Sequence, residues 1–309
     1  MRKDLQEKIA ELKRQKRAII LAHYYTNSEV QQVADFVGDS LALSQRAADV
    51  DADIILFAGV RFMAETAKVL SPAKKVLLPV VEAGCSLADS CDAEELRRAR
   101  QENPDHLVVA YVNTSVEVKA LTDICCTSSN ALDIINALPA DQKILFVPDR
   151  NLGSYINRCT GRGMKLWNGC CLVHEEFSVE KISHLKSLHP EAKVLVHPEC
   201  KPEVVAMADY AGSTAGILSY CAREDVQEVI VVTESGILYE MQERYPEKKF
   251  YLVEPDGSNE GCVSCKDMKK VTLENIYQTL LDESPEVVID EDVRQAAEGS
   301  IVRMLSMSK

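Results

Sequence analysis

The sequence of 309 residues lacks several features that mark particular classes of protein. It has no run of about 18 apolar residues, the length that a membrane-spanning helix needs. Residues 1–20 form a charged, amphipathic segment without the apolar stretch of a signal peptide. Basic residues are in the minority, since 35 Lys and Arg stand against 48 Asp and Glu, for a net charge of −13. We therefore expect a cytoplasmic protein whose main partner is neither nucleic acid nor a membrane.

Aromatic side chains are also scarce, at 6% of the chain with a single tryptophan, whereas eleven residues are cysteine. Disulfides are rare in the cytoplasm, so metal binding or catalysis is the better explanation for some of these thiols. The segment 167–174, WNGCCLVH, gathers two thiols, an imidazole and the tryptophan beside a glycine. Six other cysteines are expected to be small buried hydrophobic side chains: Cys91, Cys125, Cys126, Cys159, Cys200 and Cys221.

Short apolar runs alternate with helical patterns along the chain, as buried parallel strands and crossover helices do. The runs that end at positions 23, 111 and 197 are 88 and 86 residues apart. Cys85, Cys171 and Cys265 follow a similar spacing of 86 and 94 residues. Such regularity indicates an internal repeat. We predict an α/β fold of three similar α/β/α domains, with short parallel sheets in a pseudo-threefold arrangement around a central active site.

The expected domains are residues 1–88, which include an N-terminal helix, residues 89–177 and residues 178–268. Residues 269–309 are expected to form helices that pack back onto the body. The first repeat is longer than the others, so we interpret the segment that includes VGDS (37–40) as an insertion. The predicted strands are 18–25, 53–60, 75–80, 106–113, 124–130, 144–149, 193–199, 209–216, 229–235 and 249–256.

Ligands of open α/β folds bind beyond the carboxyl ends of the strands, where helix N-termini present free N–H groups. The hydroxyl groups expected there either cap the helices or bind an anion, and the two roles are compatible. We expect functional roles for His23, His174 and His197, and surface positions for His106, His184 and His189. The other polar candidates at strand ends are Tyr24, Tyr25, Tyr111, Asn113, Thr127, Ser128, Ser129, Glu199, Ser213 and Thr214.

Each repeat also carries cysteine just after its last strand. If three loops meet on a pseudo-threefold axis, one thiolate from each can hold a cubane iron-sulfur cluster whose fourth iron has no protein ligand. That iron would be a Lewis acid for hydroxyl, carbonyl or carboxylate groups. The sequence therefore predicts elimination of water or condensation at a carbonyl, with His, Tyr and Glu moving protons.

Three other functions use some of the same residues. An iron-sulfur hydro-lyase would act on a hydroxy acid through the same open iron. A redox-sensing or electron-transfer iron-sulfur protein would need a fully ligated cluster and no anion pocket. A zinc-stabilised binding module is the third, because Cys262-x-x-Cys265 has the spacing of a zinc knuckle, although no second C-x-x-C accompanies it. The same two thiols could instead form a disulfide or a redox pair.

Several motifs are similar to those of a known family along nearly the whole chain: LAHYY (21–25), VGDSL (37–41), AGCSLAD (83–89), YVNTS (111–115), CTSSNA (126–131), WNGCCLVH (167–174), VHPEC (196–200), GST (212–214), ESGI (234–237) and CKDM (265–268). By these motifs the chain resembles the quinolinate synthase family. The motif W-x-G-x-C-x-x-H places the metal ligand at Cys171 and leaves Cys170 as its neighbour. The C-terminal C-x-x-M motif identifies Cys265 as a ligand, and Cys262 resembles an extra cysteine with a suggested redox role in some members.

The resemblance implies a 4Fe-4S cluster with three Cys ligands, Cys85, Cys171 and Cys265, and one open iron. It also implies condensation of iminoaspartate with dihydroxyacetone phosphate to quinolinate for NAD synthesis, with an L-aspartate oxidase or dehydrogenase as a functional partner. The family's acid and base groups correspond to Tyr25, His197 and Glu199. Its substrate-binding residues correspond to His23, Ser40, Tyr111, Asn113, Ser128, His174, His197, Glu199, Ser213 and Thr214.

Overall fold

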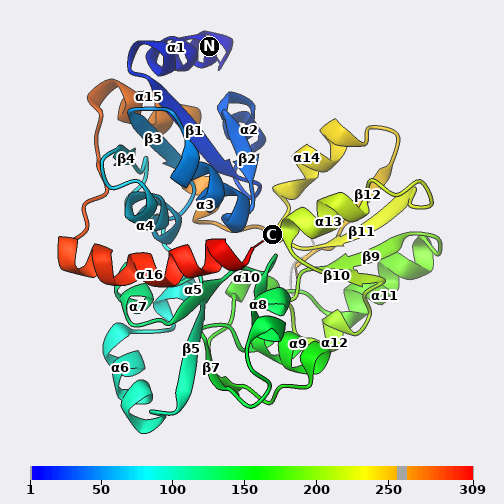
Figure 1. Cartoon of the computed structure of the whole chain (residues 1–309). Helices are drawn as coiled ribbons and strands as arrows, with labels where there is room; N and C mark the ends of the chain where they lie inside the picture. Colours follow the sequence, from blue (N-terminus) through cyan, green and yellow to red (C-terminus); the bar gives the residue numbers. More distant parts are fainter. Residues whose placement is uncertain (1, 256–262, 309) are drawn as a thin grey trace.

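Three parallel four-stranded sheets, one in each third of the chain, organise the computed structural model, which describes residues 2–255 and 263–308. The strand orders are β2-β1-β3-β4, β6-β5-β7-β8 and β10-β9-β11-β12, so the same topology occurs three times. Figure 1 shows the three sheets arranged around a common centre, with helices on their faces. The predicted fold class, three similar α/β/α units, is confirmed.

The first sheet is built on the apolar run of β1, which lies between β2 and β3 in parallel register. Helices α1 and α15 pack on one face of this sheet, and α3 and α4 pack on the other. The elements of this unit are α1 (Arg2–Gln15), β1 (Ala18–His23), α2 (Ser28–Val33), β2 (Phe36–Gly38), α3 (Ser40–Asp49), β3 (Ile54–Ala58), α4 (Arg61–Leu70) and β4 (Lys75–Leu77).

The segment interpreted as an insertion is instead a strand of the sheet. Residues Phe36–Gly38 form β2 and pair with β1, so that His23 lies opposite Gly38. In the other two sheets β6 and β10 hold the same place beside β5 and β9. The interpretation of an insertion was therefore wrong, and Ser40 occupies in the first unit the position after the second strand that Ser128 occupies in the second unit.

The second unit repeats this order with shorter strands at the sheet edges. Strand β8 pairs with β7 through two residue pairs and was also missed from the sequence. The elements of this unit are α5 (Ser86–Asp89), α6 (Ala93–Glu102), β5 (His106–Tyr111), α7 (Val116–Ala120), β6 (Ile124–Cys126), α8 (Ala131–Ala137), β7 (Lys143–Val147), α9 (Arg150–Thr160), β8 (Lys165–Leu166) and α10 (Leu172–Glu175).

The third sheet separates two buried apolar clusters, one on each face. Helices α11 and α12 contribute to the first cluster, and α13 and α14 contribute to the second. The elements of this unit are α11 (Val179–Leu188), β9 (Lys193–Val196), α12 (Pro202–Val205), β10 (Tyr210–Ala211), α13 (Thr214–Tyr220), β11 (Glu228–Val232), α14 (Ile237–Arg244) and β12 (Lys249–Leu252).

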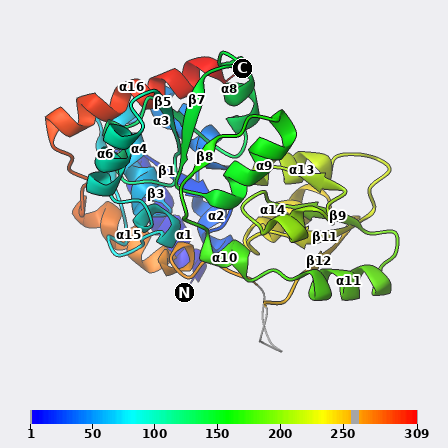
Figure 2. The same ribbon diagram turned by 90° about the horizontal axis from the view of Figure 1, so that it is seen from below.

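The remaining residues return to the first two units. A short 3₁₀ helix, η1 (Met268–Lys270), leads to α15 (Leu273–Asp282) and then to α16 (Glu291–Met307). Helix α16 packs against α7, β6 and α4, and buries Ala297, Ile301 and Met304 between the first and second units. Figure 2 shows α16 on one side of the molecule and α10 on the opposite side. The end of α16 contacts the second unit, where Asn130 Nδ2 donates to Ser308 Oγ at 2.7 Å.

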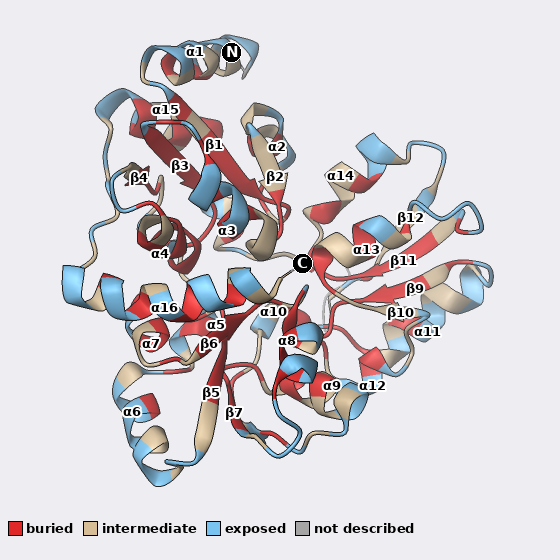
Figure 3. Ribbon diagram, viewed as in Figure 1, coloured by how far each residue is buried: buried red, intermediate tan, exposed pale blue. Residues whose placement is uncertain are grey.

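The buried residues are concentrated in the three sheets and on the helix faces that cover them. The two central strands of each sheet are buried along most of their lengths, and the outward faces of the helices are exposed (Figure 3). Within the described residues, none of the helices has the length and apolar character needed to cross a membrane. The carboxyl ends of the strands point to the common centre (Figure 1), and many polar residues of the strand-end motifs line the pocket there.

Candidate active site

One pocket lies at the junction of the three units and contains about 630 Å³ of space free of protein atoms, part of which is open to solvent. No Lys or Arg is among the described residues that line it. Of the residues proposed from the sequence, it is lined by His23, Tyr25, Ser40, Cys85, Tyr111, Asn113, Thr127, Ser128, Cys171, His174, His197, Glu199, Thr214 and Cys265.

The three pocket cysteines share one local geometry. Cys85 and Cys171 directly precede the short helices α5 and α10, and Cys265 lies three residues before the start of η1. Each thiol is stabilised by a backbone hydrogen bond from the residue three positions later, which is Ala88, His174 or Met268. Such N–H groups favour the charged form of the sulfur and are a usual feature of iron-sulfur ligands.

Burial acts in the opposite direction on these thiols. Removal from water raises the pKa of Cys85 to about 12 and raises those of Cys171 and Cys265. The charge of Cys265 acts on Cys85, and that of Cys85 acts on Cys171, so the three sulfurs lie within electrostatic reach of one another. Because a thiolate binds metal, loading a metal centre here must release protons from these thiols.

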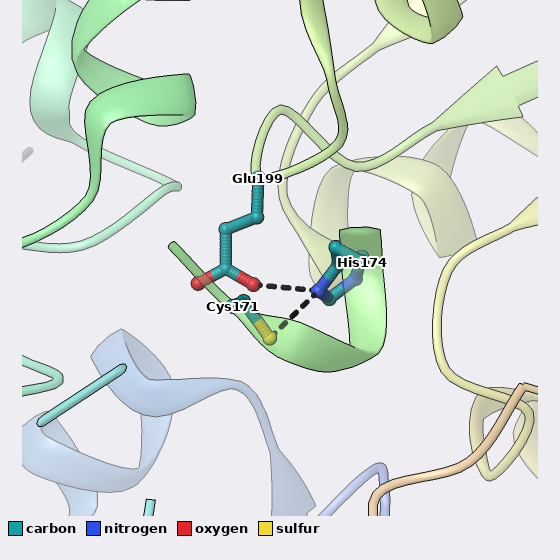
Figure 4. A group of neighbouring side chains, drawn as sticks. All are labelled: Cys171, His174 and Glu199. Atoms are coloured by element: carbon teal, nitrogen blue, oxygen red, sulfur yellow. Dashed lines mark hydrogen bonds and ion pairs between the residues drawn. The ribbon is translucent and has the colours of Figure 1, made fainter. Parts of the chain in front are cut away.

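His174 is the centre of a second group, drawn in Figure 4. Its Nδ1 lies 2.8 Å from Glu199 Oε2 and 3.3 Å from Cys171 Sγ. The rings of His174 and His197 stack with their centroids 4.7 Å apart. Burial alone would raise the pKa of Glu199, but the adjacent imidazoles of His174 and His197 lower it below its usual value. The carboxylate therefore keeps its charge although it is only 4% exposed.

His23 and His197 have the same local arrangement. In each, Nδ1 accepts the backbone N–H of the residue two positions later, Tyr25 or Glu199. This pattern assigns the proton of the neutral ring to Nε2, and the Nε2 of His197 lies 3.3 Å from Ser128 Oγ. Burial lowers the pKa of both histidines to about 3, so both rings are neutral donors near neutral pH.

Tyr25 joins the first unit to the third. Its hydroxyl lies 2.8 Å from Thr214 Oγ1 and 2.7 Å from Thr233 Oγ1, and Thr233 Oγ1 is also 3.1 Å from His174 Nε2. Burial raises the pKa of Tyr25 well above its usual value, so the hydroxyl keeps its proton. The result is a hydrogen-bonded chain from Tyr25 through Thr233 to the His174 and Glu199 pair.

The remaining polar candidates differ in what they contact. Ser40 begins α3, whose N-cap residue is Asp39, and Asp39 also accepts a hydrogen bond of 2.5 Å from Ser129 Oγ of the second unit. Asn113 Oδ1 is buried and has no hydrogen-bond partner among the described residues. Ser213 Oγ accepts the N–H of Gly216 as the N-cap of α13 and is not among the pocket-lining residues, so capping accounts for it.

Two charged residues at the pocket had no role in the sequence analysis. Glu234 follows β11 and is fully buried, and it accepts hydrogen bonds from the backbone N–H groups of Cys265 (3.0 Å) and Gly236 (2.6 Å). Lys269 lies 2.9 Å from Glu234 and also donates to the carbonyl oxygen of Tyr25 (2.6 Å). The ESGI motif contains Glu234, but only the folded chain shows that it supports the Cys265 loop.

The cysteines outside the pocket follow the expectation with one exception. The expectation was wrong for Cys159, because it lies near the end of α9 and faces solvent. Cys170 is partly exposed and is not a pocket-lining residue, and Cys262 lies outside the described residues. Five of the six cysteines predicted to be small hydrophobic side chains are buried: Cys91, Cys125, Cys126, Cys200 and Cys221.

Comparison with known proteins agrees with this site. Residues 7–306 match the family model described as "Quinolinate synthetase A protein". A protein of Microcystis aeruginosa named quinolinate synthase is 53% identical over 305 residues, which are 99% of this chain and 95% of the relative. Proteins of the same name from Trichodesmium erythraeum and Synechocystis are each 50% identical, over 99% of this chain and 94% or 96% of the relative. The chain therefore belongs to the quinolinate synthase family of enzymes.

Proposed function

We propose that this chain condenses iminoaspartate with dihydroxyacetone phosphate to give quinolinate, phosphate and water, in a pocket where Cys85, Cys171 and Cys265 hold a 4Fe-4S cluster. The observation that carries this proposal is the convergence of one cysteine from each repeat, or from the segment that follows it, on a single pocket. Family membership supports the reaction, and the same pocket supplies hydroxyl, imidazole and carboxylate groups for it.

The donor set fits such a cluster. Three thiols with N–H groups directed at their sulfurs suit an iron-sulfur centre, and no fourth cysteine lines the pocket in the described part of the chain. When bound, the cluster would supply a Lewis-acidic iron for a substrate hydroxyl or carbonyl. The carboxylate of Glu199, whose Oε1 has no partner among the described residues, lies within 4.8 Å of Cys171 Sγ and is a base beside the proposed cluster.

The substrates are anions, yet no described pocket-lining residue is Lys or Arg. Neutral donors must therefore bind the carboxylates and the phosphate. The Nε2–H groups of His23 and His197 supply two of them, and the hydroxyls of Ser40, Ser128 and Thr214 supply others, each beside a helix start or strand end with free N–H groups. Asn113 and Tyr111 complete this set, and the unpaired Oδ1 of Asn113 suits a substrate N–H or O–H donor.

Proton transfer is assigned to Tyr25, His197 and Glu199. The high pKa of Tyr25 keeps a proton on its Oη for donation to a departing oxygen, and Thr214 and Thr233 hold that hydroxyl in place. The low pKa of Glu199 keeps its carboxylate ionised, so that Oε2 can accept a proton. The adjacent imidazoles of His174 and His197 stabilise this charged form. Acid and base groups of opposite protonation state in one pocket are what a dehydration requires.

Burial of the pocket also serves the chemistry. Iminoaspartate hydrolyses in water, so an enzyme that uses it gains from a site between domains that excludes solvent. A supplier of iminoaspartate, an L-aspartate oxidase or dehydrogenase, is accordingly expected to work beside this chain. We assign His174 to the wall between cluster and substrate, since it contacts both Cys171 and Glu199.

An anaerobic assay tests the proposal. The chain is purified without oxygen, its iron and sulfide are counted, and quinolinate is measured after addition of dihydroxyacetone phosphate with iminoaspartate made in place by an L-aspartate oxidase. We expect about four iron and four sulfide per chain and quinolinate that depends on both substrates. Absence of quinolinate from a fully loaded chain, or turnover of a hydroxy acid in its place, would reject the proposed reaction.

A further inference from the structure

Cys171, His174 and Glu199 bring three metal-ligating atoms together without any help from the other two pocket cysteines. Cys171 and His174 lie three positions apart at α10, and therefore on one face of that helical turn. Glu199 follows β9 and reaches the same point from the third unit. Their Sγ, Nδ1 and Oε2 atoms all lie within 4.8 Å of one another.

We propose that the cluster-free chain binds one zinc-type divalent metal ion through Cys171 Sγ, His174 Nδ1 and Glu199 Oε2. Zinc takes thiolate, imidazole and carboxylate ligands at about 2.0–2.3 Å in a tetrahedron, whose edges are then about 3.3–3.6 Å. The observed separations of 3.3 Å from Nδ1 to Sγ and 2.8 Å from Nδ1 to Oε2 need only a small expansion to reach these values.

Two further observations point to a cation at this place. Glu199 Oε1 is buried and has no hydrogen-bond partner among the described residues, which is costly unless a ligand or ion satisfies it. The opposite nitrogen of His174, Nε2, lies 3.1 Å from Thr233 Oγ1. A hydrogen bond at the far nitrogen orients the ring of most histidine metal ligands. Here Thr233 is placed to do so, while Nδ1 faces Cys171 and Glu199.

The charge around the site agrees with this reading. The carboxylates of Asp39, Glu199 and Glu234 line the pocket, and no described Lys or Arg lines it. Three protein ligands leave one tetrahedral position for a water, as in catalytic zinc sites, and all three ligand residues line the pocket. A divalent ion is thus the group that the pocket holds when the cluster is missing.

The ion and the cluster exclude each other because both need Cys171. The three-ligand site uses neither Cys85 nor Cys265, the other two proposed cluster ligands. It can therefore be tested independently of the proposed reaction. Zinc and copper bind nitrogen and sulfur sites more tightly than ferrous iron does, so zinc in the pocket is expected to block cluster assembly. We expect zinc and the iron-sulfur cluster to compete for the thiolate of Cys171. A cluster that is already bound would keep zinc out of the site.

Cobalt(II) serves as the probe, because its bond to a thiolate gives a near-ultraviolet charge-transfer band and its tetrahedral sites absorb in the visible. Iron-free protein is titrated anaerobically with Co²⁺, and Zn²⁺ is then added as a competitor. We expect one Co²⁺ per chain with the thiolate band, and displacement by one Zn²⁺. The cluster-loaded protein should show no such band.

Variants separate this site from the cluster site. Cys85→Ser and Cys265→Ser should hold no cluster yet bind Co²⁺ as the unmodified chain does, and Cys170→Ser is the matched control for the neighbouring thiol. Cys171→Ser, His174→Asn and Glu199→Gln should each weaken Co²⁺ binding by about 100-fold or more, because each removes a direct ligand and loss of an outer-shell partner alone costs about 10–100-fold.

Two outcomes would overturn the proposal. If Cys85→Ser or Cys265→Ser abolished the cobalt band, the ion would lie among the three cysteines. If His174→Asn and Glu199→Gln both kept full affinity for Co²⁺, the ion would lie elsewhere. Because a variant could unfold, Zn²⁺ protection of Cys171 from alkylation is also measured on the unmodified chain by mass spectrometry, and unchanged labelling would count against the site. None of these readouts uses enzymatic activity, so they are independent of the proposed reaction.

Discussion

The carboxylate of Glu234 accepts the backbone N–H of Cys265 at 3.0 Å, although the two residues are 31 positions apart. Lys269 neutralises this buried carboxylate at 2.9 Å and also holds the carbonyl oxygen of Tyr25. Burial raises the pKa of Glu234, and the ammonium of Lys269 opposes that rise. One buried ion pair therefore fixes the loop of Cys265, a proposed cluster ligand, against the strand end that carries Tyr25, the proposed proton donor.

Replacing Glu234 by Gln tests this support. The amide keeps the shape but leaves Lys269 without its counter-charge, and loss of one partner of a partly buried pair is expected to cost about 2–4 kcal/mol of unfolding free energy. Denaturation of the iron-free chain measures this directly, and iron retention after cluster loading should also fall. Lys266→Met removes a charge from an exposed neighbour and is the control, which should change neither the unfolding free energy nor the iron retention. If E234Q left both quantities unchanged, Glu234 would not support the Cys265 loop.

Tyr25→Phe should slow turnover without loss of iron. The variant removes the hydroxyl that lies between Thr214 and Thr233, and general acid groups contribute about 10²–10⁴-fold to rate. Quinolinate formation and iron content, measured on the same sample, separate the chemical step from cluster binding. Tyr24→Phe is the matched control, since Tyr24 is buried beside the pocket without lining it, and it should keep nearly full turnover. A Y25F enzyme with a normal rate would exclude this proton donor.

Cys170 and Cys171, which directly precede α10, are expected to differ in their effect on cluster binding. Cys171→Ser should abolish cluster binding and activity, as should Cys85→Ser and Cys265→Ser, whereas Cys170→Ser should keep about four iron per chain. The reason is position, because Cys171 lines the pocket and Cys170 does not. Iron and sulfide analysis after anaerobic reconstitution measures the effect. The opposite result for the pair, with Cys170 required and Cys171 dispensable, would reverse the ligand assignment.

The end of α16 is expected to affect substrate affinity. Asn130 donates to Ser308 Oγ at 2.7 Å, and its Oδ1 accepts the N–H of Thr127, so the chain end holds the turn that carries Ser128. Ser308→Ala removes one hydrogen bond worth about 0.5–1.5 kcal/mol, which corresponds to a rise of about 2- to 13-fold in KM. We expect kcat and iron content to change little. Ser306→Ala, on the exposed side of the same helix, is the control, and equal KM values for both variants would reject this role.

Acid should destabilise the protein before its carboxylates titrate. His23 and His197 have folded pKa values of about 3 because they are buried, against about 6.5 when unfolded. Their stabilising contribution is complete above pH 6.5 and is lost as the pH falls toward 3, at up to about 1.4 kcal/mol per pH unit for each ring. The lowered pKa of Glu199 acts in the same direction, but only below about pH 4.5.

Denaturation of the iron-free chain between pH 8 and pH 5 measures this loss. His23→Asn should flatten the curve, because one of the two histidines with a lowered pKa no longer takes up a proton on unfolding. His184→Asn replaces an exposed histidine and should leave the slope as it was. If the free energy of unfolding of the unmodified chain were constant from pH 8 to pH 5, the claim that His23 and His197 are buried as neutral rings would be contradicted.

Local patterns were enough to predict most of the architecture. Continuous apolar runs such as β3 and β11 fold as buried parallel strands because every side chain can be covered on both faces. The regular spacing of Cys85, Cys171 and Cys265 indicated a threefold repeat, and the strand-end motifs indicated the family. Strands β2 and β8 have only three and two residues, so they are defined by pairing with a neighbour and left no recognisable pattern.

The contacts that tune the pocket came only from the tertiary structure. The bonds from Glu234 to Cys265, from Thr233 to Tyr25 and from Ser308 to Asn130 join residues that are far apart in the chain. Such pairs follow from how three units and a returning tail dock, and no periodicity or spacing encodes them. The sequence by itself determined which side chains can bind a metal or move a proton, because that depends on chemical type. Folding decided which of them are buried, neutral and within reach of one another, because desolvation and distance exist only in the packed chain.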